Sequence, residues 1–219
     1  MPAFDTPEPI SAAIDLVVGV VRVSASDRAD TVVRVSPADE SHEADVRTAE
    51  QTRVEYAAGR LLVAAPKPRA LSLFGKPGSI DITIELPAGS HLQGDAGVAT
   101  FHGTGRLGEC RVKTGVGDLN FGETGALDLN TGAGAIAVDR VAGPAEVSTG
   151  SGRVRLGEIA GSAVVKNSNG DVRIGDAAAV AGERAEVEAE LAAALEAARA
   201  VPFADTSRVG EHLYAAVNR

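Results

Sequence analysis

The turns TGVGD at 114–118, TGAGA at 131–135, TGSGR at 149–153 and NSNGD at 167–171 repeat one short pattern with a period of about 18 residues. The same spacing, carried outward, gives three columns in which every residue is aliphatic or aromatic. The columns are Val112, Leu129, Val147 and Val165; Leu119, Ile136, Val154 and Val172; and Phe121, Val138, Leu156 and Ile174. The alternate positions are polar or small, so the pattern predicts short strands with one buried face.

A fixed period that holds two short strands and two turns is typical of a stacked array, in which each copy covers the apolar face of its neighbour. An earlier, degraded copy is expected at Gly97, Ala99 and Phe101, which precede Gly117, Leu119 and Phe121 by one equal interval. We therefore predict a mainly β protein, built as a stacked β-strand repeat of β-solenoid-like form.

Residues 1–88 are expected to form an N-terminal antiparallel β region that is continuous with the stack. Its strands are predicted at 14–23, 31–35, 52–56, 61–64 and 80–86. The clearest is SIDITIELP at 79–87, where isoleucine and leucine alternate with polar residues, so that one face is buried. The loop at 66–79 holds Leu71, Leu73 and Phe74 and is expected to fold back on the sheet.

The repeat array is predicted to span 89–176, and residues 177–219 to form a short helical tail. Where the next glycine turn would fall, near residue 188, the chain carries AEVEAELAAALEAARA instead, which predicts a helix over 183–200 that ends before Pro202. A second helix is predicted over 207–217. The tail either caps the open strand edges of the stack, or pairs with another copy or a partner chain, or is a fused segment of separate origin.

The composition excludes several classes of protein. The net charge is −9 and the Lys and Arg residues do not cluster, which argues against nucleic-acid binding because phosphate contacts need gathered cations. Cys110 is the only cysteine, so an internal disulfide and a cysteine-based metal site are excluded, and we expect a half-buried, inert thiol. Asp5, Glu8 and Asp15 interrupt the N-terminus and no apolar run of membrane-spanning length exists, so we predict a cytoplasmic protein with no membrane insertion.

Two glycine-containing motifs suggest a ligand, but their context favours a structural role. GAGAIA at 132–137 fits the dinucleotide pattern G-x-G-x-x-A, yet Ile136 is a strand position where the motif needs a helix. Asp118 and Asp171 resemble part of a calcium-binding β-roll, but Ala135 and Arg153 replace the carboxylate in the copies between. The four histidines lack metal-type spacing. We expect no catalytic residue, no cofactor and no metal.

The column Thr114, Thr131, Thr149 and Asn167 places hydroxyl and amide groups in a row. We expect a hydrogen-bonded ladder that holds the turns in register. A row of polar groups beside a flat sheet could instead grip an extended polymer such as a glycan.

Several segments together resemble a known family. They are FDTPEPI at 4–10, EQTRVEY at 50–56, SIDITIELPAGS at 79–90, GRLGECRVKTGVGDL at 105–119 and VVKNSNGDVRIGD at 164–176. The chain is similar there to an uncharacterised bacterial β-strand-repeat family, common in actinomycetes, whose members are often labelled putative adhesins. The resemblance covers residues 1–176 and implies a repeat architecture without assigning catalytic residues. Family members usually carry the glycine turns further, so the helical tail departs from that pattern.

The function predicted from the sequence is a non-enzymatic, adhesin-like interaction or scaffold module that presents the outer face of a β stack to an unknown protein or glycan. The candidate binding face consists of Lys113, Arg153, Arg155, Lys166 and Arg173. One alternative is a polysaccharide-processing enzyme, which paired carboxylates on one face would support. Another is a structural or regulatory partner protein, or a homo-oligomer, that acts through the helical tail.

Overall fold

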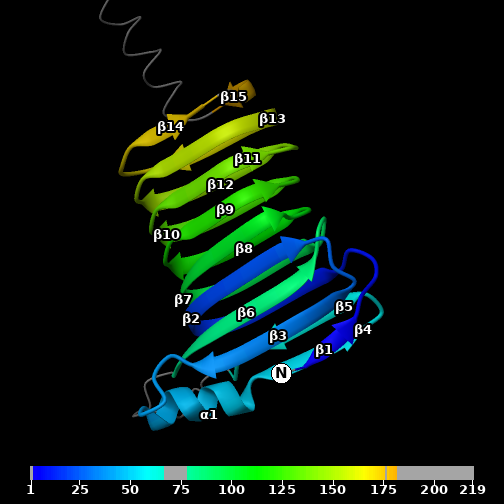
Figure 1. Cartoon of the computed structure of the whole chain (residues 1–219). Coiled ribbons are helices and arrows are strands. Elements are labelled where there is room, and N and C mark those ends of the chain that lie inside the picture. Colours follow the sequence, from blue (N-terminus) through cyan, green and yellow to red (C-terminus); the bar gives the residue numbers. More distant parts are fainter. Residues whose placement is uncertain (1, 67–77, 176, 182–219) are drawn as a thin grey trace, which may run out of the picture. The chain divides into compact units, whose positions relative to one another are not determined.

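The computed structural model of the protein describes residues 2–66, 78–175 and 177–181, the last five at the level of the backbone. Within these ranges fifteen strands join one large mixed sheet, and one helix packs beside it (Figure 1). The mainly β part of the prediction is confirmed. The helices expected at 183–200 and 207–217, and the apolar part of the loop at 66–79, lie outside the described residues.

In chain order the strands are β1 (Ala3–Asp5), β2 (Ser11–Ser26), β3 (Asp30–Pro37), β4 (Arg53–Ala57), β5 (Arg60–Ala64), β6 (Ser79–Pro87), β7 (His91–Arg106), β8 (Cys110–Val116), β9 (Leu119–Thr124), β10 (Leu127–Ala133), β11 (Ile136–Val141), β12 (Ala145–Ser151), β13 (Val154–Asn167), β14 (Val172–Ile174) and β15 (Ala177–Ala181). The helix α1 (Glu43–Gln51) follows β3.

Two parallel ladders carry the repeats. Ladder A consists of β5, the first half of β2 and of β7, then β8, β10, β12 and the second half of β13. Ladder B consists of β6, the second half of β2 and of β7, then β9, β11, the first half of β13 and β14. Each copy gives one strand to each ladder, and in Figure 1 the copies follow one another in chain order from β7 to β13, from green to yellow.

The three predicted apolar columns pair from strand to strand as their spacing requires. On ladder A, Val112, Leu129 and Val147 are aligned and each is at most 1 % exposed. The columns that begin at Leu119 and Phe121 align in the same way on ladder B. The inward faces of both ladders contribute to one apolar cluster. Each fully buried aliphatic side chain stabilises the fold by about 1.5–3 kcal/mol, so these columns hold the copies together.

The threonine column is an internal ladder and does not face solvent. Thr114, Thr131 and Thr149 are aligned and at most 2 % exposed. The Thr131 hydroxyl donates to the Gly117 carbonyl oxygen at 3.2 Å, and the Asn167 amide donates to that of Gly152 at 3.1 Å. The side chains therefore bond the glycine turns of the preceding copy, as the ladder hypothesis expects, and they are not available to grip a polymer.

The glycine turns stack so closely that no side chain fits between them. A Cβ at Gly134 would lie 2.1 Å from the carbonyl oxygen of Gly117, and one at Gly152 would lie 2.0 Å from that of Gly134. The backbone of both residues also has a positive φ, at 153° and 152°. The approach of the neighbouring backbone therefore requires glycine at this point of the copies that contain Gly117, Gly134, Gly152 and Gly170, whereas the equivalent position in β7 is Ala99.

The copy expected at Gly97, Ala99 and Phe101 is present with a different register. The sequence pattern aligns Phe101 with Phe121, but β7 pairs Phe101 with Leu119, two positions earlier on β9. Leu119 follows Phe101 by 18 positions, as Ala145 follows Leu127 in the later copies, whereas the sequence pattern used an interval of 20. A Cβ at Gly94 would lie 2.7 Å from the Phe101 ring, so that ring occupies the space which a column side chain would fill. Strand β2 is a further copy, in which Val21 aligns with Phe101.

The N-terminal region is mixed, so the purely antiparallel prediction is wrong. Antiparallel pairs join β1 to β3, β3 to β6 and β4 to β5. In contrast, β2 is parallel to β5, β6 and β7. Its partner residues in β7 are distant in sequence, as Ser11 and His91 are, and such a long connection leaves no local periodicity to detect. The N-terminal strands therefore continue the two ladders.

Helix α1 is not indicated by apolar periodicity, because Asp45 is its only buried residue. The Asp45 carboxylate accepts the backbone N–H of Ser79 at 2.9 Å, which fixes the helix against the start of β6. Gly78 permits the contact, since a Cβ there would lie 2.2 Å from the Ala44 carbonyl oxygen. This polar contact, the close backbone approach and the packing of the partly buried Ala49 against the core together hold the helix in place.

The strand ladders continue past Asp176. Residues 177–181, which the sequence analysis assigned to the start of the helical tail, form β15 and pair in parallel with β13. The edge of β13 supplies backbone hydrogen-bond partners there, and this outweighs the helix propensity of alanine. None of the residues in the described ranges forms a helix that is long and apolar enough to cross a membrane.

Candidate functional site

The five residues of the predicted binding face are all exposed, but the two ladders divide them. On ladder A, Lys113 and Lys166 share one column and are separated by Asn130 and Ser148. Three strand steps at about 4.8 Å place them about 14 Å apart. On ladder B, Arg155 and Arg173 are direct neighbours. The remaining residue, Arg153, lies in the turn between β12 and β13.

Because both ladders turn their inward faces to the same core, their outward faces are separate surfaces. The spacing of the sequence places cations in columns, but it does not indicate which ladder each column belongs to. The structure therefore brings Arg155 and Arg173 together and holds them apart from the lysine column.

A second outward column of ladder A lies at the beginning of each strand. Gln93, Arg111, Asp128, Glu146 and Val164 are aligned there on five successive strands. Two depressions lie along this column, with volumes of about 370 Å³ and about 210 Å³. Glu109 and Arg111 line both depressions, so the two form one surface feature, which we call the ladder A furrow.

The larger depression is rich in carboxylates. Glu109, Asp128 and Glu146 line it together with Arg111 and Ser162. The Arg111 guanidinium donates to Glu109 at 2.7 Å, and its Nε lies 3.4 Å from the Asp128 carboxylate. These side chains are about half exposed, so the ion pairs add little stability and mainly orient the charges. Within the described part of the chain the Glu146 carboxylate has no hydrogen bond or ion pair, and it is available to a ligand.

The smaller depression is lined by Ser11, Arg60, His91 and Gln93, which come from β2, β5 and β7. His91 Nδ1 accepts the backbone N–H of Glu109 at 2.9 Å. A neutral imidazole that accepts through Nδ1 carries its proton on Nε2. In its neutral form His91 therefore has one N–H donor, on Nε2, that has no partner among the described residues.

Cys110 lies directly behind the furrow and is fully buried. The thiol is therefore more deeply buried than the half-buried thiol that the sequence predicts. Burial raises the pKa of the Cys110 thiol to about 12, and the charge of Glu109 adds to that effect. The thiolate, which is the reactive form, is therefore scarce at neutral pH. The inert character that the sequence analysis expected follows from burial.

The described residues offer no centre for a metal, because nowhere in them do three or more His, Cys, Asp and Glu side chains gather to hold an ion. Asp118, one of the two acidic residues that resemble a calcium loop, instead accepts the backbone N–H of Ala135 at 2.7 Å. That bond links one glycine turn to the next copy. Asp118 is thus a structural residue of the turn stack.

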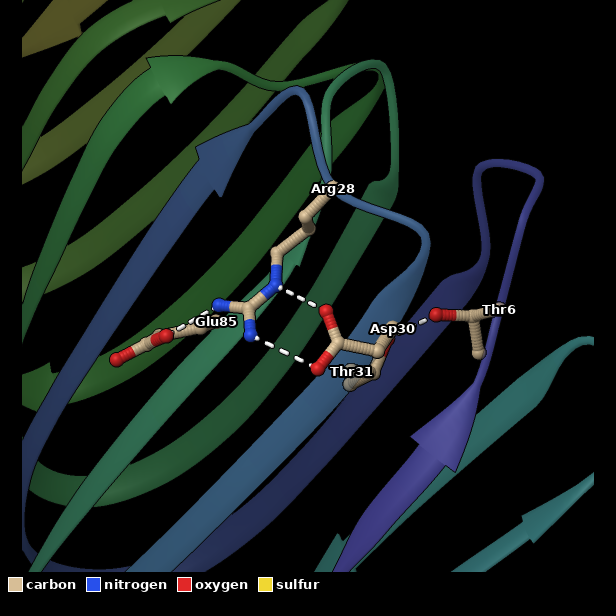
Figure 2. A network of polar contacts seen from close by, with 5 residues as sticks. All are labelled: Thr6, Arg28, Asp30, Thr31 and Glu85. Atoms are coloured by element: carbon tan, nitrogen blue, oxygen red, sulfur yellow. Dashed lines mark hydrogen bonds and ion pairs between the residues drawn. The ribbon is translucent and has the colours of Figure 1, made fainter.

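A polar network outside the furrow joins the β2–β3 connection to β6 (Figure 2). The Arg28 guanidinium donates to both carboxylate oxygens of Asp30, at 2.9 Å and 3.1 Å, and also to Glu85. These bonds hold the pKa of the Asp30 carboxyl below its usual range. The arginine is occupied by two acidic residues of the protein, so the network fastens strands and does not present a ligand site.

Comparison with known proteins finds distant structural matches alone. No family model matches the chain, and no curated protein matches it. Solved structures that resemble it include a putative adhesin from Bacteroides fragilis (12 % identity, covering 83 % of this chain and 94 % of that one, TM-score 0.38). A putative cell adhesion protein from Clostridium sporogenes has 12 % identity, coverages of 83 % and 97 %, and a TM-score of 0.30. A putative lipid binding protein from Parabacteroides distasonis has 13 % identity, coverages of 83 % and 92 %, and a TM-score of 0.37.

The names of the first two structures agree with the adhesin-like label of the resemblance found in the sequence. Their source organisms do not support its actinomycete part. At these identities and scores the likeness assigns no ligand, and the function has to be argued from the geometry of the furrow.

Proposed function

We propose that the protein is a non-enzymatic, adhesin-like interaction module, in which a β-solenoid-like stack presents the ladder A furrow to an extended polysaccharide. The observation that carries the proposal is the alignment of Gln93, Arg111, Asp128 and Glu146 on successive strands along two adjoining depressions. Amide, guanidinium and carboxylate groups recur there at about the 4.8 Å strand spacing. A polymer that crosses the strands meets a donor or an acceptor at each step.

The composition of the furrow favours a polar polymer over a protein partner. Stable protein interfaces are usually centred on buried aromatic or large apolar residues. Among the described residues the exposed large apolar side chains are Val98 and Val116, which lie away from the strand starts that form the furrow. The furrow combines charged, amide and hydroxyl groups with small or aliphatic residues such as Ala126, Pro144 and Ala145, and within the described ranges no Phe, Tyr or Trp side chain lines it. Protein binding is therefore the less favoured ligand class for this surface.

The enzymatic alternative rests on Asp128 and Glu146, which are register neighbours on β10 and β12. Most glycoside hydrolases need two carboxyl groups that flank the scissile bond. However, the Asp128 side chain is 50 % exposed and contacts Arg111, whereas a catalytic acid is generally set in an apolar, desolvated pocket. Release of reducing ends from a bound polysaccharide, abolished by Asp128→Asn and Glu146→Gln, would favour the enzyme over the binding module.

Binding of the full-length protein to immobilised polysaccharides tests the proposal. The triple variant Arg111→Ala, Asp128→Ala, Glu146→Ala removes side chains of the furrow, and the double variant Arg155→Ala, Arg173→Ala on ladder B is the matched control. We expect the triple variant to weaken binding at least about tenfold, since each lost charged hydrogen bond contributes on the order of 1.5–3 kcal/mol. We expect the control to bind normally.

A loss confined to the ladder B variant would move the site to that face. A loss seen only in a chain that ends at residue 182 would instead favour a partner protein that acts through the tail. The cytoplasmic location stays a prediction, and detection of the native protein on intact cells would contradict it.

A further inference from the structure

The smaller depression of the furrow combines several polar side chains whose hydrogen-bonding capacity is not used by the protein. Within the described part of the chain, the Arg60 guanidinium, the Gln93 amide and the Ser11 hydroxyl make no hydrogen bond or ion pair. All three line the same depression of about 210 Å³, together with His91. We call these four residues the Arg60 pocket.

The strand register holds the members of this pocket close together. Ser11 pairs with Arg60 on one side and with His91 on the other, and Gln93 lies two residues beyond His91 on β7. Three adjacent strands at about 4.8 Å therefore place the residues of Arg60 and His91 about 10 Å apart, with Ser11 between them. A ligand group of the size of one sugar ring can contact all three strands at once.

The two arginines that line this depression differ in what they contact. Arg111 is engaged by Glu109 and lies beside Asp128, so its charge is compensated within the protein. Arg60 has no acidic partner in the described residues. The pocket therefore carries uncompensated positive charge and several unused donors, although the protein as a whole has a net charge of −9. An anionic group is the ligand that satisfies these donors.

We propose that the Arg60 pocket binds the carboxylate of an acidic sugar unit within the polysaccharide, an inference that rests on the proposed function and names its ligand class. The Arg60 guanidinium pairs with the carboxylate through parallel N–H donors, and Gln93 and Ser11 donate to its remaining lone pairs. In its neutral form His91 supplies the Nε2 proton as a further donor.

The neighbouring half of the furrow limits how many acidic units the polymer carries. Asp128 and Glu146 line the larger depression, and a second carboxylate of the ligand placed there would meet like charge. The matching polymer has acidic units separated by neutral ones, whose hydroxyl groups donate to Asp128 and Glu146. A uniformly acidic polymer fits less well.

The test uses the full-length protein and two oligosaccharides of equal length. One is an octasaccharide in which glucuronic acid alternates with N-acetylglucosamine, and the other is an N-acetylglucosamine octamer without carboxylates. Calorimetry should show the alternating probe binding at least about tenfold more tightly, because a charged hydrogen bond contributes on the order of one decade in affinity or more. Raised salt should reduce the difference.

The variant Arg60→Gln should abolish the preference, because the affinity for the alternating probe falls to that for the neutral octamer measured on the same variant. The matched control is Arg53→Gln on β4, an exposed arginine outside the pocket whose contact is an ion pair of 3.8 Å with Glu55. We expect the control to keep the preference. A comparison of thermal midpoints identifies any variant that fails to fold, and Arg60→Lys then serves as a second variant that keeps the charge but loses the planar fork.

Four outcomes would overturn the inference. Equal affinity of the wild-type protein for both octamers would refute it while leaving the proposed function standing. A preference that survives Arg60→Gln would do the same. Tighter binding of an acidic peptide of alternating Asp and Ser than of either octamer, or no binding of either octamer, would refute the inference and the polysaccharide proposal together.

Discussion

The N-terminal region and the glycine-turn copies stabilise their strands in different ways. In the N-terminal region single side-chain contacts join the elements: Arg28 bonds Asp30 and Glu85, Thr6 bonds Thr31 at 2.8 Å, and the rings of Phe4 and Tyr56 lie 5.1 Å apart. In the copies from β8 to β13 the same few contacts recur at every step, through stacked glycines and aligned threonines.

This difference indicates where each region is vulnerable. A contact that recurs in every copy involves the backbone of two neighbouring copies. A substitution that displaces the backbone of one copy therefore also displaces the backbone of the next. A contact that occurs once and involves exposed or partly exposed side chains, such as the Arg28 ion pairs, is replaced by water at low cost, whereas the buried Thr6–Thr31 bond is not. Substitutions in the copies should therefore cost more than equivalent substitutions in the N-terminal region.

The largest effect is expected for Gly134→Ala in the turn stack. The new Cβ would lie 2.1 Å from the Gly117 carbonyl oxygen, so the two copies must separate. We expect a loss of at least about 4 kcal/mol in the free energy of unfolding, which is the size associated with overpacking and backbone strain. Urea denaturation followed by circular dichroism measures it.

The matched control is Gly59→Ala in the β4–β5 hairpin. Gly59 also has a positive φ, at 75°, but a Cβ there meets no atom within 4 Å. Only the backbone cost of about 1–2 kcal/mol applies. Equal losses for the two variants would contradict the view that neighbouring backbones impose glycine in the stack.

The second effect concerns the Phe101 ring, which fills the space beside Gly94 in the core. Phe101→Ala should cost about 3–5 kcal/mol, because it leaves a cavity in the core of β7. Phe4→Ala in the N-terminal region, where the ring is partly buried against Tyr56, should cost less. Both values come from denaturant unfolding.

A double-mutant cycle sharpens this prediction. Gly94→Val alone should destabilise the protein, since a Cβ at Gly94 would lie 2.7 Å from the Phe101 ring. In the Phe101→Ala background the same substitution fills the cavity and should cost less or restore stability. Additive effects would show that the ring and the glycine are independent.

The third comparison uses two buried threonines with different partners. The Thr131 hydroxyl has one proton, which it shares between the carbonyl oxygens of Gly117 and Ala133, and the Ala133 oxygen also accepts the backbone N–H of Gly117. Thr131→Val should therefore cost about 1–3 kcal/mol, because it removes the hydroxyl that donates to the Gly117 oxygen. The Thr124 hydroxyl is buried and has no hydrogen-bond partner among the described residues. Thr124→Val should therefore be neutral or raise the thermal midpoint. A stabilising Thr131→Val would contradict the threonine ladder.

The smallest effect is a pH dependence confined to the N-terminal region. Arg28 holds the pKa of Asp30 below its ordinary value, so the pair stabilises the folded state fully above the unfolded pKa of about 4. The contribution is lost as the pH falls through the lower, folded-state pKa. Asp30→Asn should remove this part of the acid sensitivity, as measured by thermal midpoints between pH 6 and pH 2. The control is Asp118→Asn, in the turn stack. This variant should keep the acid sensitivity that the Arg28–Asp30 pair causes.

Local periodicity made much of the repeat predictable. The columns at Val112, Leu119 and Phe121 recur at a nearly constant interval. Copies that are adjacent in the sequence also pair with each other in the ladders. The position of β2 was not predictable, because its partners in β7 are distant in sequence and its own segment shows no turn motif. The register of β7 differs from the expected one because Phe101 pairs with Leu119, 18 positions away, as in the later copies, whereas the alignment of Phe101 with Phe121 implies an interval of 20.

The candidate site was less predictable than the fold. The sequence predicts a binding face of exposed cations, and the structure divides them between two ladders, with Lys113 on ladder A and Arg155 on ladder B. Nothing in the sequence indicates Arg60, Gln93 or His91, because they belong to different strands and no motif links them. The only available signal was that Gln93 and Arg111 occupy equivalent positions in successive copies.

The amino-acid sequence by itself determined that the protein is mainly β, that its copies recur at a nearly constant interval, and that its glycine turns are structural. Those properties are local, since each depends on residues within one or two copies. Tertiary structure alone decided which ladder each outward side chain joins, and hence that Arg60 lies near His91. Pairing between β5, β2 and β7 sets that neighbourhood, and it depends on long-range backbone hydrogen bonds that no local pattern encodes.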